Sequence, residues 1–184
     1  MASQIKEYTL KDGTKITAYV PSNVSSDTPI FYYSYVVGSD YSKDPVWKGM
    51  EEDMARYDGD AIVIIPHDKK LQIGGESTAT HKYQINATEA FETVKQDLNI
   101  ETTQFINGGF SAGFGYGTRT LAHYLQENPN ADRQVLLAVD GVINPTANLQ
   151  QSELDALKAN NTVIISFTQQ KNHKYQANLF KSTN

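Results

Sequence analysis

Short apolar runs alternate with amphipathic stretches along most of the chain, after two β-rich runs at its start. Residues 5–10 and 14–20 hold many β-branched and aromatic side chains, and the Lys-Asp-Gly sequence at 11–13 between them is typical of a hairpin turn. Residues 30–37 (IFYYSYVV) and 61–66 (AIVIIP) have the composition of buried strands. The pattern therefore predicts an antiparallel pair followed by strands that are covered on both faces.

From residue 45 onward, predicted helices and strands alternate. Pro45 is expected to begin a helix, with apolar residues at helical spacing up to Tyr57, and Gly59 is expected to follow its end. A long polar loop is expected at 67–85, and Asn86 or Thr88 is expected to cap the next helix. The further predicted strands are 104–110, 134–139 and 162–167, and the further predicted helices are 86–98, 112–126 and 152–159, with a last helix beginning at 175–180.

Alternation of strands and helices with short connections is typical of a parallel sheet with helices on both faces. The predicted fold class is α/β, a three-layer α/β/α arrangement. Its sheet holds about seven mostly parallel strands and begins with the antiparallel N-terminal pair. No internal repeat or linker divides the sequence, so residues 1–184 are expected to form a single domain.

Composition and charge narrow the classes of function. Lys and Arg number 16 and Asp and Glu 21, so the net charge is −5, which argues against a general nucleic-acid binder. The chain has no cysteine, which excludes disulfides, thiolate nucleophiles and zinc–thiolate sites. No signal peptide and no apolar run of membrane-spanning length is visible, so a cytoplasmic location is expected. A virion protein or a protein exported without a leader would have the same features.

One segment carries a chemical motif. Residues 107–117 read NGGFSAGFGYG and contain G-x-S-x-G at 109–113, between a predicted strand and a predicted helix. A serine on such a tight turn is exposed above the sheet edge, as a nucleophile must be, and Gly109 and Gly113 keep bulk away from it. The motif thus predicts Ser111 as the nucleophile and the N–H of Ala112 as an oxyanion-hole donor.

Two other interpretations of these glycines are open. The segment could be a glycine-rich turn that only packs a strand against a helix. It could also be a dinucleotide-binding loop, although that loop belongs after the first strand of a sheet, and here only two clear strands follow. The Walker pattern is absent, because no Lys-Ser/Thr pair follows the glycines.

The order of the elements and the motif resemble the α/β-hydrolase family, most of all small esterases and lipases. In that family an antiparallel pair begins the sheet, an oxyanion loop follows the third strand, and the serine follows the fifth. The resemblance implies a second oxyanion N–H at Tyr35 or Val36. The family often has His-Gly at this loop, whereas residues 34–38 here read SYVVG.

The acid and the base are implied by the same resemblance. In the family the histidine follows an eighth strand and the acid usually follows the seventh, but residues 168–170 here are TQQ and the chain ends at Asn184. The acid follows the sixth strand in some lipases, where this chain has Asp140. The predicted base is His173, which follows the seventh predicted strand at the same sheet edge. The other histidines are His67, at the end of a predicted strand, His81 in the polar loop, and His123 inside a predicted helix.

Two functions of different classes follow. The first is a serine carboxylic ester hydrolase that forms an acyl-enzyme and needs neither metal nor cofactor, with a small-molecule or acyl-ester substrate. The second is a catalytically inactive module of the same fold, used for binding or as part of a larger assembly. The sequence is also compatible with a homo-oligomer. It is compatible as well with a fragment of a longer protein, in which the histidine would lie on residues that are not present here.

Overall fold

The computed structural model describes residues 4–34, 52–67, 77–110, 113–139 and 149–167. Within these ranges the chain forms seven strands and three complete helices. The strands are β1 (Gln4–Thr9), β2 (Lys15–Val20), β3 (Ile30–Ser34), β4 (Ile62–Pro66), β5 (Phe105–Phe110), β6 (Val135–Val139) and β7 (Val163–Phe167). The helices are α2 (Ser77–Leu98), α3 (Gly113–Glu127) and α4 (Gln151–Ala159).

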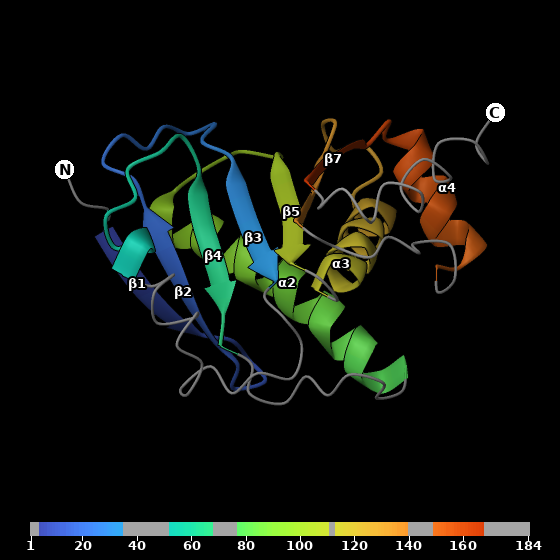
Figure 1. Cartoon of the computed structure of the whole chain (residues 1–184), viewed down its shortest axis with the longest axis horizontal. Coiled ribbons are helices and arrows are strands. Elements are labelled where there is room, and N and C mark those ends of the chain that lie inside the picture. The colour runs from blue at the N-terminus through green and yellow to red at the C-terminus, as the bar shows by residue number, and fades with distance from the viewer. Residues whose placement is uncertain (1–3, 35–51, 68–76, 111–112, 140–148, 168–184) are drawn as a thin grey trace.

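All seven strands belong to one mixed sheet with the order β1-β2-β4-β3-β5-β6-β7. β1 pairs antiparallel with β2, and β2 pairs antiparallel with β4, while every other neighbouring pair is parallel (Figure 1). The predicted α/β class, the antiparallel start and the seven strands are confirmed. Each predicted strand is found within a few residues of its expected bounds, with residues 35–37 lying outside the described part.

The main core lies between one face of the sheet and the helices α2, α3 and α4, with α2 and α3 behind the sheet in Figure 1. Its centre is aromatic: the rings of Phe91 and Phe105 lie 4.6 Å apart, and Tyr124 lies 5.4 Å from each of them. α4 covers the sheet less completely, because Leu154 and Leu157, which the sequence places inward, are only half-buried. α3 packs directly on β5, and α2 and α4 both pack against α3.

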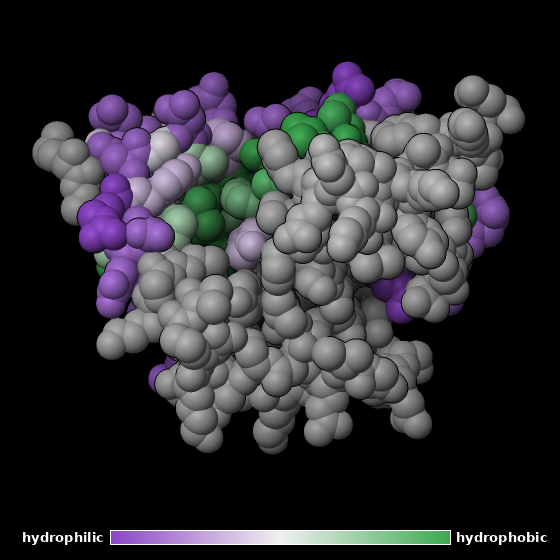
Figure 2. Space-filling model, viewed as in Figure 1, coloured by the Kyte–Doolittle hydropathy of each residue, from purple (hydrophilic) through white to green (hydrophobic). Residues whose placement is uncertain are grey.

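The opposite face of the sheet packs against the end of the first predicted helix. Residues 52–54 are helical, and Met54 and Tyr57 pack on Tyr19, Val63 and Ile65 from the strands beneath. Figure 2 shows apolar residues gathered over β4 on this face, with polar residues on the side of β1. The predicted apolar stripe of 45–57 thus faces the sheet at its C-terminal end, although helical backbone ends at residue 54, and residues 45–51 lie outside the described part.

The predicted hairpin turn is confirmed at 11–13. Gly13 has φ +84°, a conformation that residues with a Cβ rarely adopt, and its N–H donates to the Leu10 carbonyl at 2.9 Å. The Asp12 carboxylate accepts the Thr14 N–H at 2.9 Å. The Asp-Gly pair therefore closes the hairpin for the reason expected from its sequence.

The predicted start of the helix after β4 was wrong. Residues 67–85 were expected to be a loop, but α2 begins at Ser77, and Asn86 and Thr88 lie inside it rather than capping it. The described side chains of α2 include an apolar stripe of Ala87, Ala90, Phe91 and Val94, all fully buried. Because helix prediction from sequence rests on that stripe, the polar first turns carried no signal. The predicted helix at 175–180 lies outside the described residues.

A polar cluster joins the edge strand β1 to α2. Lys6 Nζ lies 2.6 Å from the Asp97 carboxylate, and the Tyr8 hydroxyl donates to the same oxygen at 2.9 Å. The bonds from Lys6 and Tyr8 hold the pKa of Asp97 below its usual value. The stabilisation they give is present above the unfolded-state pKa of an aspartate, about 3.9, and is lost as pH falls through the lower folded-state pKa.

Replacing Asp97 by asparagine is therefore expected to lower Tm by about 1–3 °C at pH 7, because the carboxylate is half-exposed and such pairs contribute little. The difference from wild type should shrink as pH falls below about 4. Thermal unfolding by circular dichroism between pH 2.5 and 7 measures both effects. Glu7→Gln, at an exposed position of the same strand, is the control and should shift Tm less. An Asp97→Asn effect that grows on acidification would contradict the assignment.

Candidate active site

The parallel strands end together at one edge of the sheet. Ser34 of β3 pairs with Gly109 of β5, while Phe110 pairs with Val139 of β6, which pairs in turn with Phe167 of β7. In α/β sheets this carboxyl edge is where ligands bind. The chain leaves the four strand ends at residues 35, 111, 140 and 168.

The central junction at this edge has the form that the motif requires. β5 ends at Phe110 and α3 begins at Gly113, so only residues 111–112 connect strand to helix. Gly109 is buried between Ser34 and Ala138, and Gly113 is the first residue of α3. Ser111 and Ala112 lie outside the described residues, so their proposed nucleophile and oxyanion roles stay predictions. The predicted strand before them and the predicted helix after them are confirmed.

The other predicted site residues also lie outside the described part of the chain. These are Tyr35 and Val36, Asp140, and His173. The sheet nevertheless fixes the strands from which they follow: β3 and β6 are the two direct neighbours of β5, at about 5 Å on either side. The backbone thus brings the strand ends before Tyr35 and Asp140 next to the strand end before Ser111.

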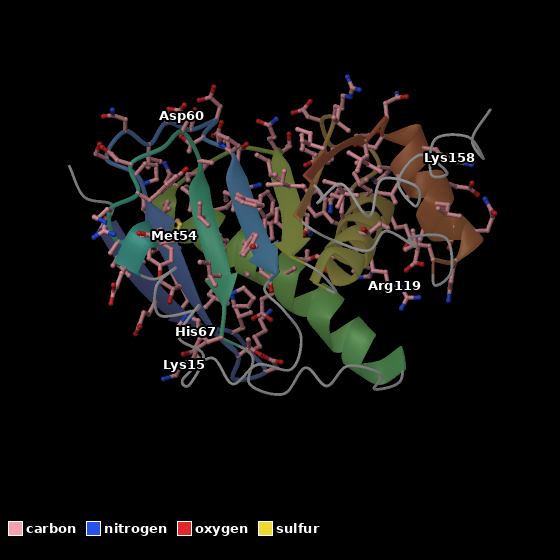
Figure 3. The ribbon with its side chains drawn as sticks, viewed as in Figure 1. Lys15, Met54, Asp60, His67, Arg119 and Lys158 are labelled. Atoms are coloured by element: carbon pink, nitrogen blue, oxygen red, sulfur yellow. The ribbon has the colours of Figure 1, made fainter. Side chains whose placement is uncertain are left out.

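His67, directly after β4, is held away from this junction. Its ring Nε2 shares a hydrogen bond of 2.6 Å with the hydroxyl of Thr17, and the backbone N–H of His67 donates to the Lys15 carbonyl at 2.8 Å. Both partners belong to β2, which lies on the side of β4 opposite to β3 and β5 (Figure 3). β4 is itself two strands, about 10 Å, from β5. His67 is therefore not arranged as a base for Ser111.

His123 is also excluded by its position. It lies ten residues along α3 from Gly113, which places it about 15 Å from the start of the helix. Its Nε2 lies 3.3 Å from the carboxylate of Glu127, one turn further on. The sequence interpretation of His123 as a surface or packing residue agrees with this contact. Of the four histidines, His81 and His173 remain: His81 is a residue of α2 whose side chain is not described, and His173 lies outside the described residues.

The strand beneath the junction holds a polar residue that sequence analysis missed. Asn107 of β5 is fully buried, and within the described part of the chain neither Nδ2 nor Oδ1 of its side chain has a hydrogen-bond partner. It faces α3 at Gly117, where an added Cβ would lie 3.0 Å from Oδ1. The available signal was an amide in the middle of a predicted buried strand, where apolar residues are the rule.

Two negative findings concern the described residues only. Within them, no group of three or more His, Asp or Glu side chains is arranged to hold a metal ion. Their helices include none with the length and apolar character needed to cross a bilayer.

The strand order, the antiparallel start and the β5–α3 junction define the α/β-hydrolase fold. No family model and no curated protein matches the sequence. Among solved structures, a thermostable esterase from Pseudomonas putida is similar, with TM-score 0.56 and 16% identity over 86% of this chain and 52% of that chain. The Francisella virulence factor BioJ is similar with TM-score 0.54 and 13% identity, over 89% and 56%.

A carboxyl esterase from the mycorrhizal fungus Tuber melanosporum gives TM-score 0.52 and 14% identity, over 85% of this chain and 55% of that chain. At such identities the likeness shows the fold alone. The chain spans about half the length of these solved structures. The prediction of an α/β-hydrolase fold is confirmed.

Proposed function

We propose that this protein is a serine esterase that acts through Ser111. One observation carries the proposal: a G-x-S-x-G serine occupies the two-residue connection between β5 and α3, at the carboxyl edge of a seven-stranded sheet. α3 has 15 residues and begins at this connection, so its N-terminal dipole favours negative charge there. Two of the similar solved structures are named as esterases, which is consistent with this chemistry.

In this mechanism the Ser111 hydroxyl attacks the carbonyl carbon of a small ester while a histidine accepts its proton. The oxyanion that forms is held by the N–H of Ala112 and by a second N–H from Tyr35 or Val36. Collapse of the intermediate expels the alcohol, which takes the proton from the histidine, and leaves Ser111 acylated. Water activated by the same histidine then releases the carboxylic acid. The proposed reaction uses no metal or cofactor.

His173 is the proposed base and Asp140 the proposed acid. His173 follows β7 and Asp140 directly follows β6, so both segments leave the sheet at the edge where Ser111 lies. The contacts of His67 with β2 and the position of His123 on α3 leave His81 as the other candidate base in this chain. His81 belongs to the first turns of α2, six residues before the buried Ala87.

Labelling with a fluorophosphonate probe tests the proposal. The wild-type chain is expected to be labelled at a single site, because the probe phosphonylates an activated serine, and Ser111→Ala is expected to abolish labelling. Mass spectrometry of the labelled peptide identifies the residue. Ser152→Ala, at an exposed position of α4, is the matched control and should be labelled at the wild-type rate.

A folded wild-type chain that resists labelling would contradict the esterase proposal and favour the non-catalytic module instead. Labelling that persists in Ser111→Ala would also contradict it, because another nucleophile would then be responsible. Circular dichroism of each variant confirms that loss of labelling is not loss of folding.

A further inference from the structure

Asn107 is an exception to the rule that buried polar groups are paired. It is 0% exposed, and neither its amide nitrogen nor its amide oxygen has a hydrogen-bond partner among the residues that the structure describes. Its neighbours across the sheet, the aromatic Tyr32 and the aliphatic Leu136, are almost fully buried. An apolar residue here would remove the cost of burying the unpaired amide, so stability alone does not account for an asparagine.

The geometry around Asn107 shows what its shape does. The amide lies against the backbone of α3 at Gly117: a Cβ added there would be 3.0 Å from Asn107 Oδ1 and 3.7 Å from Cγ. The same Cβ would be 3.6 Å from the Gly108 carbonyl oxygen. Two thin groups, a planar amide and a glycine, therefore face each other where β5 and α3 approach. A side chain at 117 would meet the amide oxygen at less than an ordinary contact distance, so the amide or the helix would have to shift by a few tenths of an ångström.

We propose that Asn107 and Gly117 form a spacer that sets the distance between β5 and α3 and thereby positions Ser111. This inference rests on the proposed esterase function. Ser111 belongs to the two-residue connection between that strand and that helix, so any change in their separation displaces it. Asn107 is four residues before Ser111 and Gly117 is six residues after it. Both residues affect Ser111 only through the positions of β5 and α3, and neither is a catalytic residue.

A double-mutant cycle on these two positions tests the spacer. Gly117→Ala is expected to lower kcat for p-nitrophenyl butyrate and the rate of fluorophosphonate labelling by about tenfold, with KM within twofold, because small displacements of a nucleophile are costly. Asn107→Ala is expected to lower both by a similar factor, since the helix is no longer held at its distance. In the double variant the new Cβ fills the space of the amide, so adding Gly117→Ala to Asn107→Ala should cost less than twofold.

Thr120→Val is the matched control, because Thr120 is a fully buried residue of α3 whose hydroxyl has no hydrogen-bond partner in the described ranges. This variant removes an unpaired polar atom from the same helix without touching the spacer. It is expected to raise Tm and leave kcat within twofold of wild type. Asn107→Ala, in contrast, should lower kcat while leaving most of the thermal stability, a separation that a purely structural residue would not show.

Hydrogen exchange provides a readout that does not depend on catalysis. The amides around Gly117 in α3 are expected to exchange at least tenfold faster in Asn107→Ala than in wild type, even if the wild-type chain proves inert to the fluorophosphonate. Faster exchange together with an inert wild-type chain would contradict the esterase function but support the role of Asn107 in spacing α3 from β5. Single variants that keep kcat and the labelling rate within twofold in an active wild-type background would overturn the positioning role. Independent, additive losses in the cycle would overturn it as well.

Discussion

Replacing His173 by alanine is expected to lower kcat for a small ester by about three orders of magnitude, because general-base removal of the serine proton contributes about that much. KM should change little, since the imidazole acts mainly in the transition state. The measurement is steady-state hydrolysis of p-nitrophenyl butyrate, with fluorophosphonate labelling as a second readout. Asp140→Asn is expected to cost somewhat less, because it leaves the histidine present but poorly oriented.

The other three histidines serve as the controls for this prediction. His67→Ala and His123→Ala are expected to keep kcat within about threefold, because His67 is bonded to β2 and His123 lies far along α3. His81→Ala is expected to behave in the same way. Full activity in His173→Ala together with a loss in His81→Ala would show that α2 provides the base and that His173 does not. Activity unaffected by either change would contradict a base from this chain.

The frame of the candidate site was predictable from sequence because it depends on local patterns. The strands β3, β4, β5, β6 and β7 lie within a few residues of their predicted bounds, since the strands of a parallel sheet are rich in apolar residues. The glycines at 109 and 113 marked the β5–α3 junction to within one residue of its position in the structure. The strands and the β5–α3 junction could therefore be predicted, because hydrophobic periodicity and turn residues encode them locally.

Contacts between distant residues could not be predicted. The hydrogen bond from His67 to Thr17 spans 50 residues and joins two strands that the sequence does not mark as neighbours. Without it, His67 was as good a candidate base as its place at a strand end suggested. The packing of Asn107 on Gly117 is similar, because the sequence marks Asn107 only as an amide in a buried strand, and the approach of helix to strand gives the pair its role.

A buried glutamine forms hydrogen bonds at the amino ends of β5 and β6, opposite to the carboxyl edge that holds the candidate site. Gln134, the residue before β6, is 0% exposed, and its amide oxygen accepts the Phe105 N–H at 2.6 Å. Its amide nitrogen donates to the carbonyls of Thr103, at 2.8 Å, and of Asp132. Its own N–H donates to the Asn160 side chain at 2.9 Å. One side chain thus satisfies three backbone groups where β5 and β6 begin, and Asn160 extends the network to the end of α4.

Gln134→Leu is expected to destabilise the fold by about 2–4 kcal/mol, because leucine fills a similar volume but leaves those three backbone groups without partners. For a chain of this length that corresponds to a fall in Tm of about 5–15 °C. Thermal and urea unfolding measure the loss. Gln126→Leu, at an exposed position of α3, is the matched control and should stay within about 0.5 kcal/mol of wild type. A Gln134→Leu variant as stable as this control would show that water or backbone adjustment replaces the amide. The network lies at the edge of the sheet opposite to Ser111, so a folded Gln134→Leu variant is expected to keep its labelling rate, which separates stability from catalysis.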